Sequence, residues 1–221
     1  MTVSLQAYLE NLEEETYELM VGTGDSNALS YGFTKKRAVH PGVSGQMIPP
    51  PMAPQKWVEL MGQEPDMSKK RMVYIHIPFC SHICLYCGFF QNFINEDREQ
   101  RYVARLLKEL EMAKADKMLQ AKPMQCVFFG GGTPSALSPA NIAKVLQKLK
   151  ECIPLTNDCE ITMEARIYDL QKERIEAWFA NGVNRVSIGV QSFDTKIRQA
   201  SGRLDTKETV MERLKLISSY D

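Results

Sequence analysis

Strand-like and helix-like segments alternate along the chain from residue 72, and this alternation restricts the possible folds more than any other feature. Four short apolar runs rich in β-forming residues are typical of buried strands: 72–78, 125–130, 159–164 and 185–190. Three helical patterns separate them: 96–119, 138–153 and 169–182. Ser138 suits a helix N-cap and Gly182 a helix C-terminus. Strands that alternate with helices indicate βαβ units and a parallel sheet.

Right-handed crossovers between such units curl a parallel sheet toward a barrel. A closed barrel of eight units needs roughly 250 residues, whereas residues 71–221 supply about four units. We therefore expect an α/β fold with a partial (β/α) barrel. The last residues are helical where a fifth strand should begin, so we also expect the chain to be a fragment or an incomplete gene model.

Residues 1–70 differ from this pattern, and we expect them to form an irregular N-terminal extension. An acidic helix is predicted over about 4–20, followed by a stretch rich in Pro, Gly and basic residues and by a short helix over 54–62. The first twenty residues carry five glutamates and do not resemble a signal peptide. No apolar run approaches the roughly 20 residues needed to span a bilayer. These observations favour a cytoplasmic protein.

The chain has 27 basic and 27 acidic residues and a formal net charge of zero. This balance argues against broad electrostatic binding to nucleic acid or to an anionic membrane. We therefore expect neither partner.

The most specific motif is Cys80-x3-Cys84-x2-Cys87, directly after the first predicted strand. Three thiolates on one short loop can hold three irons of a cubane cluster and leave the fourth iron open. The alternative is a zinc site, but zinc favours four ligands in paired short spacings, and His76 or His82 would make a strained fourth ligand. The other three cysteines lie in apolar surroundings and are predicted to be packing residues.

A Cx3Cx2C motif with an aromatic residue before the last cysteine, here Tyr86, resembles the signature of the radical S-adenosylmethionine (SAM) superfamily. YIHIPFC further resembles the branch that contains oxygen-independent coproporphyrinogen III oxidase and a related haem chaperone. The resemblance implies a [4Fe-4S] cluster on Cys80, Cys84 and Cys87, with SAM chelated to the open iron. An electron from the reduced cluster would cleave SAM to methionine and a 5′-deoxyadenosyl radical.

A second motif, FFGGGTPS at 128–135, follows the second predicted strand. Consecutive glycines let the backbone approach a ligand and expose its N–H and C=O groups. A phosphate loop is the rival interpretation, although no G-x4-GK[ST] pattern is present, and a plain turn is the simplest one. The family resemblance implies that Gly131, Gly132 and Thr133 contact SAM.

Single polar residues at the other strand ends match further positions of the family. Glu164 matches a SAM-binding glutamate, although Ala165 and Arg166 stand where many relatives have an acidic residue or Asn before Pro. Gln191 and Arg203 match positions near a second SAM or the substrate, with a capped strand and a surface charge as the alternatives. Tyr74 matches a tyrosine near SAM, with simple strand packing as its alternative.

One expectation needs no family. The cysteine loop, the glycine loop, Glu164 and Gln191 each follow a predicted parallel strand. Parallel α/β folds bind ligands at the carboxyl ends of their strands. The four signals should therefore meet in one site.

Several longer segments resemble the anaerobic haem-degrading radical SAM methyltransferases: HPG at 40–42, CGFFQN at 87–92, LTNDCEIT at 155–162 and SIGVQSF at 187–193. This implies methylation and opening of haem with release of iron, and a low-potential electron donor of the flavodoxin or ferredoxin type. The alternatives are an oxidase that decarboxylates a porphyrin precursor, a haem chaperone without turnover, and an inactive fragment. Basic residues in the extension could contact haem or its propionates, although a solvated loop is the simpler interpretation: Lys35, Lys36, Arg37 and His40.

Overall fold

The computed structural model describes residues 11–14, 16, 47–88 and 92–220. The chain divides into two compact units, residues 1–52 and 53–221, and each is described by itself. Most of the helix expected over 4–20, and all of the basic stretch with Lys35 and His40, lie outside the described residues. The first unit contains the short 3-10 helix η1 (Pro50–Met52). The second begins with α3 (Ala53–Met61), which confirms the short helix expected there.

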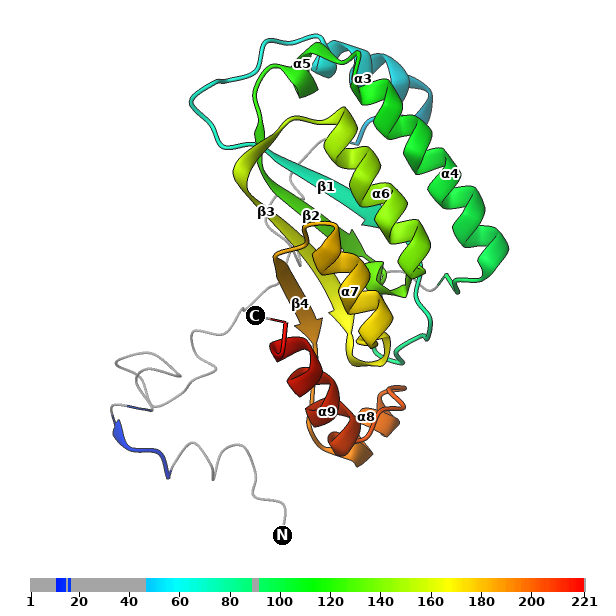
Figure 1. Cartoon of the computed structure of the whole chain (residues 1–221), viewed down its shortest axis with the longest axis vertical. Helices are drawn as coiled ribbons and strands as arrows, with labels where there is room; N and C mark the ends of the chain where they lie inside the picture. Colours follow the sequence, from blue (N-terminus) through cyan, green and yellow to red (C-terminus); the bar gives the residue numbers. More distant parts are fainter. Residues whose placement is uncertain (1–10, 15, 17–46, 89–91, 221) are drawn as a thin grey trace. The chain divides into compact units, whose positions relative to one another are not determined.

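A four-stranded parallel sheet forms the centre of the second unit (Figure 1), as the alternating pattern predicted. The strands lie in sequence order: β1 (Met72–Ile77), β2 (Met124–Gly131), β3 (Leu155–Arg166) and β4 (Arg185–Gly189). The sheet does not close. The expected partial α/β barrel is therefore confirmed, and the carboxyl ends of all four strands lie at one edge.

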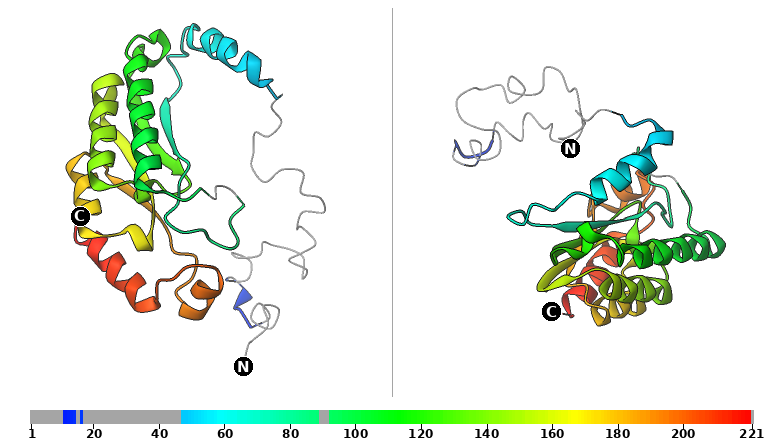
Figure 2. Two further views of the ribbon diagram at one scale, coloured as in Figure 1. Left: turned by 90° about the vertical axis from the view of Figure 1, so that its right-hand side faces the viewer. Right: turned by 90° about the horizontal axis from the view of Figure 1, so that it is seen from above.

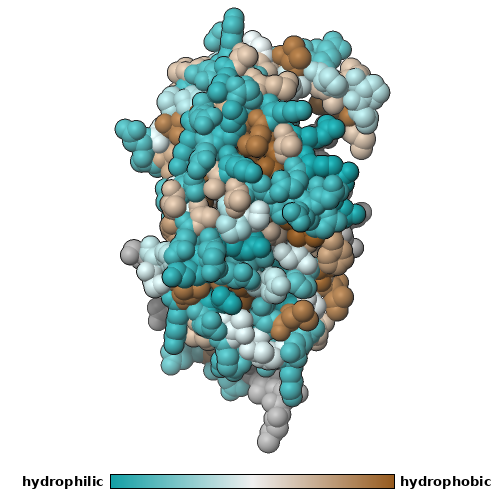
Figure 3. All heavy atoms as spheres, turned by 45° about the vertical axis from the view of Figure 1, so that its right-hand side comes forward, coloured by the Kyte–Doolittle hydropathy of each residue, from teal (hydrophilic) through white to brown (hydrophobic). Residues whose placement is uncertain are grey.

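Three amphipathic helices pack on one face of this sheet: α4 (Glu96–Ala113), α6 (Pro139–Cys152) and α7 (Lys172–Ala180) (Figure 2). Between the two layers lies an apolar core from which water is excluded, and its fully buried members include Phe129, Leu146 and Trp178. The outward face of these helices is largely hydrophilic (Figure 3). None of the described helices is long and apolar enough to cross a membrane.

The boundaries of the helices differ from the sequence pattern where side chains make specific contacts. The helix expected over 96–119 ends at Ala113 and a short second helix, α5 (Lys117–Gln120), follows. Asp116 causes this break, because its side chain accepts a hydrogen bond from the Leu119 amide at 3.2 Å and so caps the second helix. Ser138 occupies the N-cap of α6, but its hydroxyl donates to Glu99 of α4 at 2.6 Å instead of capping.

The backbone after β4 is held by a buried ion pair. Arg198, on α8 (Thr195–Ala200), is fully buried and its guanidinium lies 3.0 Å from Asp205. The same guanidinium donates to the carbonyls of Val190 and Ser192. The chain then continues into α9 (Lys207–Ser218). A buried charge is tolerated when it is fully paired in this way, and the pairing fixes the loop that carries Gln191.

Candidate functional site

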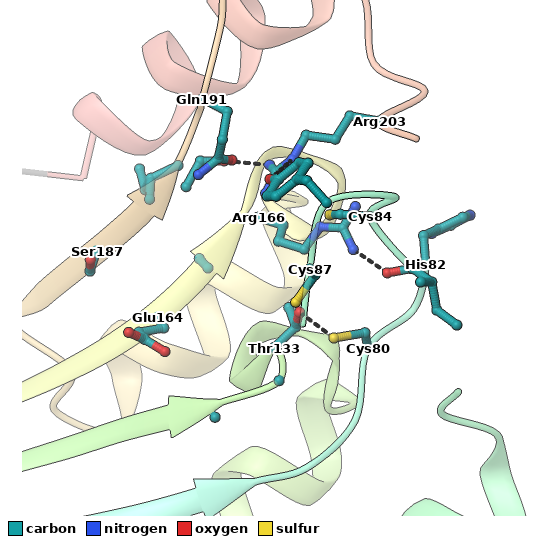
Figure 4. Close-up of a pocket in the computed structure, with 17 residues that line it drawn as sticks. Cys80, His82, Cys84, Cys87, Thr133, Glu164, Arg166, Ser187, Gln191 and Arg203 are labelled. Atoms are coloured by element: carbon teal, nitrogen blue, oxygen red, sulfur yellow. Dashed lines mark hydrogen bonds between the residues drawn. The ribbon is translucent and has the colours of Figure 1, made fainter. Parts of the chain in front are cut away.

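A pocket of about 360 Å³ lies at the carboxyl ends of the four strands (Figure 4). The cysteine loop, the glycine loop and the ends of β3 and β4 all contribute to its wall. Ten of the predicted site residues line it: Cys80, Cys84, Tyr86, Cys87, Gly131, Gly132, Thr133, Glu164, Gln191 and Arg203. The four segments therefore meet at one place, as parallel topology requires.

The cysteine loop is attached to the rest of the fold at both of its ends. The Cys80 amide donates to the Asn92 carbonyl at 2.9 Å, and the Ile94 amide donates to the Cys80 carbonyl at 3.1 Å. Farther along, the Leu85 amide donates to the carbonyl of Ser201 at 3.0 Å, just after α8. These backbone contacts fix where the three thiols point.

The three thiols belong to one pocket and none of them forms a disulfide. Cys80 and Cys84 are each 8% exposed, and Cys87 is more open. Burial raises the pKa of the Cys80 thiol, and a hydrogen bond from the Thr133 hydroxyl at 3.2 Å opposes that rise. Within the described residues, no three His, Cys, Asp or Glu side chains converge closely enough to hold a single metal ion.

The glycine loop is required for close packing against the end of β1. A Cβ atom on Gly132 would lie 2.6 Å from the Phe79 carbonyl oxygen, and Gly131 has a φ of +116°. The Gly132 amide donates to Ile77 at 2.8 Å and the Thr133 amide donates to Phe79 at 2.7 Å. We expected these amides to be exposed toward a ligand. Instead they join the glycine loop to the start of the cysteine loop.

Glu164 is half-buried at the end of β3. Burial raises the pKa of this carboxyl, and a hydrogen bond from the Gly131 backbone opposes the rise. Tyr74 lies on the neighbouring side of Gly130, but it is 51% exposed and is not among the residues that line the pocket. Its ring stacks on Phe128 with a centroid separation of 6.2 Å. Tyr74 nevertheless lies beside Glu164, because a Cβ on Gly130 would meet the Tyr74 hydroxyl at 2.9 Å and the Glu164 carboxylate at 3.1 Å.

Gln191, Arg203 and Tyr86 form the wall of the pocket beyond β4. Gln191 is the one non-glycine residue with positive φ in the described chain, at 63°, a conformation that costs energy for most side chains. Arg203 is 5% exposed, and its Nε donates to the Tyr86 hydroxyl at 3.1 Å. It also donates to the Gly189 carbonyl. Arg203 therefore links the cysteine loop to the end of β4.

Sequence reasoning missed two polar residues next to this pocket, Arg166 and Asp169. Arg166 lines the pocket and was noted only as a departure from the family pattern. Side chains two positions apart on a strand point to the same face, so the spacing from Glu164 could have placed it there. Asp169 is 1% exposed and accepts hydrogen bonds from Ser81 and Ser135. Nothing in the local sequence indicates these distant partners.

The fold and the site define a class. The model of the radical SAM superfamily matches residues 74–221, and the chain belongs to this superfamily. Its members use a [4Fe-4S] cluster and SAM. The assignment agrees with the resemblance found in the cysteine motif.

Two curated relatives and one solved structure are similar to the chain. Anaerobilin synthase of Escherichia coli O157:H7 is 40% identical over 189 residues, which cover 86% of this chain and 42% of the relative. Heme chaperone HemW of Buchnera aphidicola is 38% identical over 127 residues, which cover 57% of this chain and 33% of the relative. The structure of coproporphyrinogen III oxidase (HemN) from Escherichia coli superposes with a TM-score of 0.65 at 23% identity. The superposition covers 75% of this chain and 38% of the oxidase, and it shows that the two share a fold. The chain thus spans less than half the length of each relative.

The residues of the pocket fit the cofactors of the family. A single zinc ion needs sulfurs about 2.3 Å from one centre, whereas a cubane spreads its thiolates because each bonds a different iron. Three thiols that line one pocket fit a cluster in which each thiolate binds a different iron. The half-buried carboxylate of Glu164 and the buried guanidinium of Arg203 line the same pocket. They provide charges of both signs, which suit the amino and carboxylate groups of SAM.

Proposed function

We propose that the chain belongs to a radical SAM methyltransferase that methylates haem, opens the macrocycle without oxygen and releases its iron. One observation carries this choice within the superfamily. The similarity to anaerobilin synthase covers 86% of the chain and so extends beyond residues 74–221, whereas the similarity to the haem chaperone covers 57%. The N-terminal region therefore contributes to the likeness with the haem-degrading class.

In this proposal Cys80, Cys84 and Cys87 hold the cluster. Gly131, Gly132, Thr133 and Glu164 surround the SAM that is cleaved, and the Glu164 carboxylate pairs with its amino group. The bound cofactors supply a reactive radical next to the substrate. The protein's task is to hold these groups in register and to keep water from them.

The far wall of the pocket is proposed to hold a second SAM, which would be the methyl donor. Tyr86, Gln191 and Arg203 lie on that wall. The buried guanidinium of Arg203 keeps N–H groups beyond those that it gives to Tyr86 and Gly189, and guanidinium groups bind carboxylates well. Tyr74, outside the pocket, is proposed to act only at the edge of the SAM site. The electron donor is proposed to be a low-potential flavodoxin or ferredoxin.

The test is an anaerobic incubation of the reconstituted protein with SAM, a low-potential reductant and haem. Mass spectrometry follows both 5′-deoxyadenosine and the tetrapyrrole. We expect deoxyadenosine together with a methylated, iron-free, open-chain product. A tetrapyrrole that has lost carboxyl groups would overturn the proposal in favour of an oxidase. Tightly bound but unaltered haem would overturn it in favour of a chaperone.

A further inference from the structure

Arg166 is a buried charge at the end of β3 that the proposed function does not use. Its side chain lines the pocket beside the cysteine loop (Figure 4), and the residue is 8% exposed. A buried guanidinium costs free energy unless its N–H groups are paired. One nitrogen, Nη1, donates to the His82 carbonyl, whereas Nε is buried and has no hydrogen-bond partner among the described residues. Of the five N–H groups of this guanidinium, one at Nη1 is thus held by the cysteine loop, and the one at Nε is buried without a partner.

The carbonyl that Arg166 contacts belongs to the cysteine loop, because His82 lies between Cys80 and Cys84. The preceding loop residue, Ser81, donates to Asp169 at 3.3 Å. Asp169 in turn accepts from Ser135 at 2.9 Å. The end of β3 and the turn after it thus hold two consecutive residues of the cysteine loop. A change at Arg166 should be felt first in the position of that loop.

The charge of Arg166 also acts on the thiols. The guanidinium is buried and lines the same pocket as Cys80, Cys84 and Cys87. Positive charge and N–H donors near an iron–sulfur cluster stabilise the reduced, more negative state and so raise its reduction potential. The guanidinium of Arg166 carries a charge of this kind, and the residue lines the same pocket as the three thiols.

We propose that Arg166 is a positioning residue for the iron–sulfur cluster, which holds the cysteine loop through the His82 carbonyl and places a buried positive charge in the wall of the cluster's pocket. The proposal rests on the cluster of the superfamily and does not depend on which tetrapyrrole is the substrate. It gives a structural role to a residue that stands where many relatives carry a different sequence.

The first measurement is the midpoint potential of the reconstituted cluster in the full 221-residue chain, by electron paramagnetic resonance during a redox titration without SAM. We expect Arg166→Gln to lower the potential, because the charge is lost. Arg166→Lys keeps the charge and should stay closer to the wild-type potential. Arg71→Gln is the matched control, because the Arg71 guanidinium also donates to backbone carbonyls, those of Met118 and Lys122, but does not line the pocket. It should leave the potential unchanged.

The second measurement needs no cluster. In the apoprotein, the backbone amides of the cysteine loop should exchange with deuterium faster in both Arg166 variants than in wild type, because the loop is less firmly held. A third measurement uses the loaded protein: iron retention against a chelator should fall by about tenfold or more, the usual effect of losing an outer-shell partner. Arg166→Lys serves all three measurements if Arg166→Gln does not fold, as judged by circular dichroism.

An unchanged potential in a folded Arg166→Gln variant overturns the proposal. If that variant instead binds SAM more weakly at an unchanged potential, the free N–H serves the SAM carboxylate, and the cluster role is wrong. Wild-type amide exchange rates in both variants would refute the loop-holding part of the role. These outcomes leave the haem hypothesis untouched, because none of them involves a tetrapyrrole.

Discussion

The hydroxyl of Thr133 donates a hydrogen bond to the Sγ atom of Cys80 across 3.2 Å. Thr133 ends the glycine loop and Cys80 opens the cysteine loop, so this contact joins the two motifs of the site directly. A hydrogen bond to sulfur stabilises the thiolate more than the thiol. The contact therefore favours the form of Cys80 that binds iron.

Replacing Thr133 with Val keeps the shape of the side chain and removes the donor. The pKa of Cys80 should then rise further above its ordinary value, because burial is no longer opposed by this hydrogen bond. Alkylation of Cys80 in the apoprotein should be slower at a fixed pH near 8, and its pH profile should move upward, as read by peptide mass spectrometry. Thr133→Ser retains the hydroxyl and should behave like wild type. Equal profiles for Thr133→Val and wild type would contradict this role.

Gly132→Ala should destabilise the fold. The added Cβ would lie within 3 Å of three backbone atoms of Phe79, and the carbonyl of Phe79 cannot move away without breaking its hydrogen bond from the Thr133 amide. We expect a loss of about 1–3 kcal/mol in the free energy of unfolding, typical of overpacking, measured by urea denaturation. Gly88→Ala is the control, since a Cβ there meets nothing within 4 Å, and its effect should stay within about 0.5 kcal/mol. Equal losses for the two variants would contradict the packing argument.

Glu164 should make SAM binding depend on pH. Its carboxyl has a raised pKa because it is half-buried, and only the ionised form attracts the amino group of SAM. Affinity should therefore fall as the pH is lowered through this raised pKa, at a higher pH than for an exposed glutamate. Isothermal titration calorimetry at a series of pH values from acidic to neutral would follow the change. Glu164→Gln should bind SAM more weakly and lose this dependence; a variant with the wild-type profile would show that another group is responsible.

Asp169 should affect stability in the direction opposite to an ordinary surface carboxylate. Burial raises its pKa above the unfolded value, so the native state binds more protons between these two values. Stability contributed by this group therefore increases as the pH falls through the folded pKa and is lost as the pH rises. The difference in unfolding free energy between wild type and Asp169→Asn should shift in favour of wild type on acidification, as measured by urea denaturation at several pH values.

Asp66 provides the control with the opposite sign. Hydrogen bonds from Ser68 lower the pKa of this exposed carboxyl. Its contribution is present above the unfolded pKa and is lost as the pH falls. The difference in unfolding free energy between wild type and Asp66→Asn should therefore shift against wild type on acidification. Slopes of the same sign for the two variants would show that burial of Asp169 is not the cause.

Single Cys→Ser variants should separate the cluster ligands from the packing cysteines. Serine at position 80, 84 or 87 should strongly reduce the iron and sulfide retained after anaerobic reconstitution, because one thiolate bond to iron is lost. Cys152→Ser is the control, since Cys152 is buried in the core under the helices and away from the pocket. It should retain a full cluster although it unfolds more easily. Loss of iron in Cys152→Ser alone would contradict the assignment.

The sequence predicted the strands, their parallel order and the edge at which the pocket forms, because each of these follows from local periodicity and from connection rules. The strand expected over 159–164 is longer in the structure, at Leu155–Arg166, since neighbouring strands extend the pairing beyond the apolar run. The break of the first long helix at Asp116 was missed, because an aspartate cap is weak evidence inside a strong helical pattern. Local sequence signals therefore predicted which helices and strands form better than where each one begins and ends.

Individual roles in the site were harder to predict than its location. The amides of the glycine loop donate to carbonyls of the chain itself, and Tyr74 lies outside the pocket. Neither fact could be predicted, because both depend on how β1 packs against β2. Arg166 and Asp169 act on loop residues more than 80 positions away. The boundary near residue 70 and the roles of the SAM-site residues stay predictions. Long-range side-chain contacts of this kind have no signature in a short window of sequence.

The link between Tyr86 and Arg203 spans 117 positions of the chain. During synthesis, the cysteine loop reaches the cytosolic side of the ribosome long before its partner beyond β4 has been translated. A nascent chain therefore has its thiols in place but not the clamp that orients them. Delivery of iron and sulfide to the complete fold should be efficient, whereas premature delivery would meet a loosely held loop. The order of biosynthesis thus favours a maturation system that acts after the segment beyond β4 has been translated.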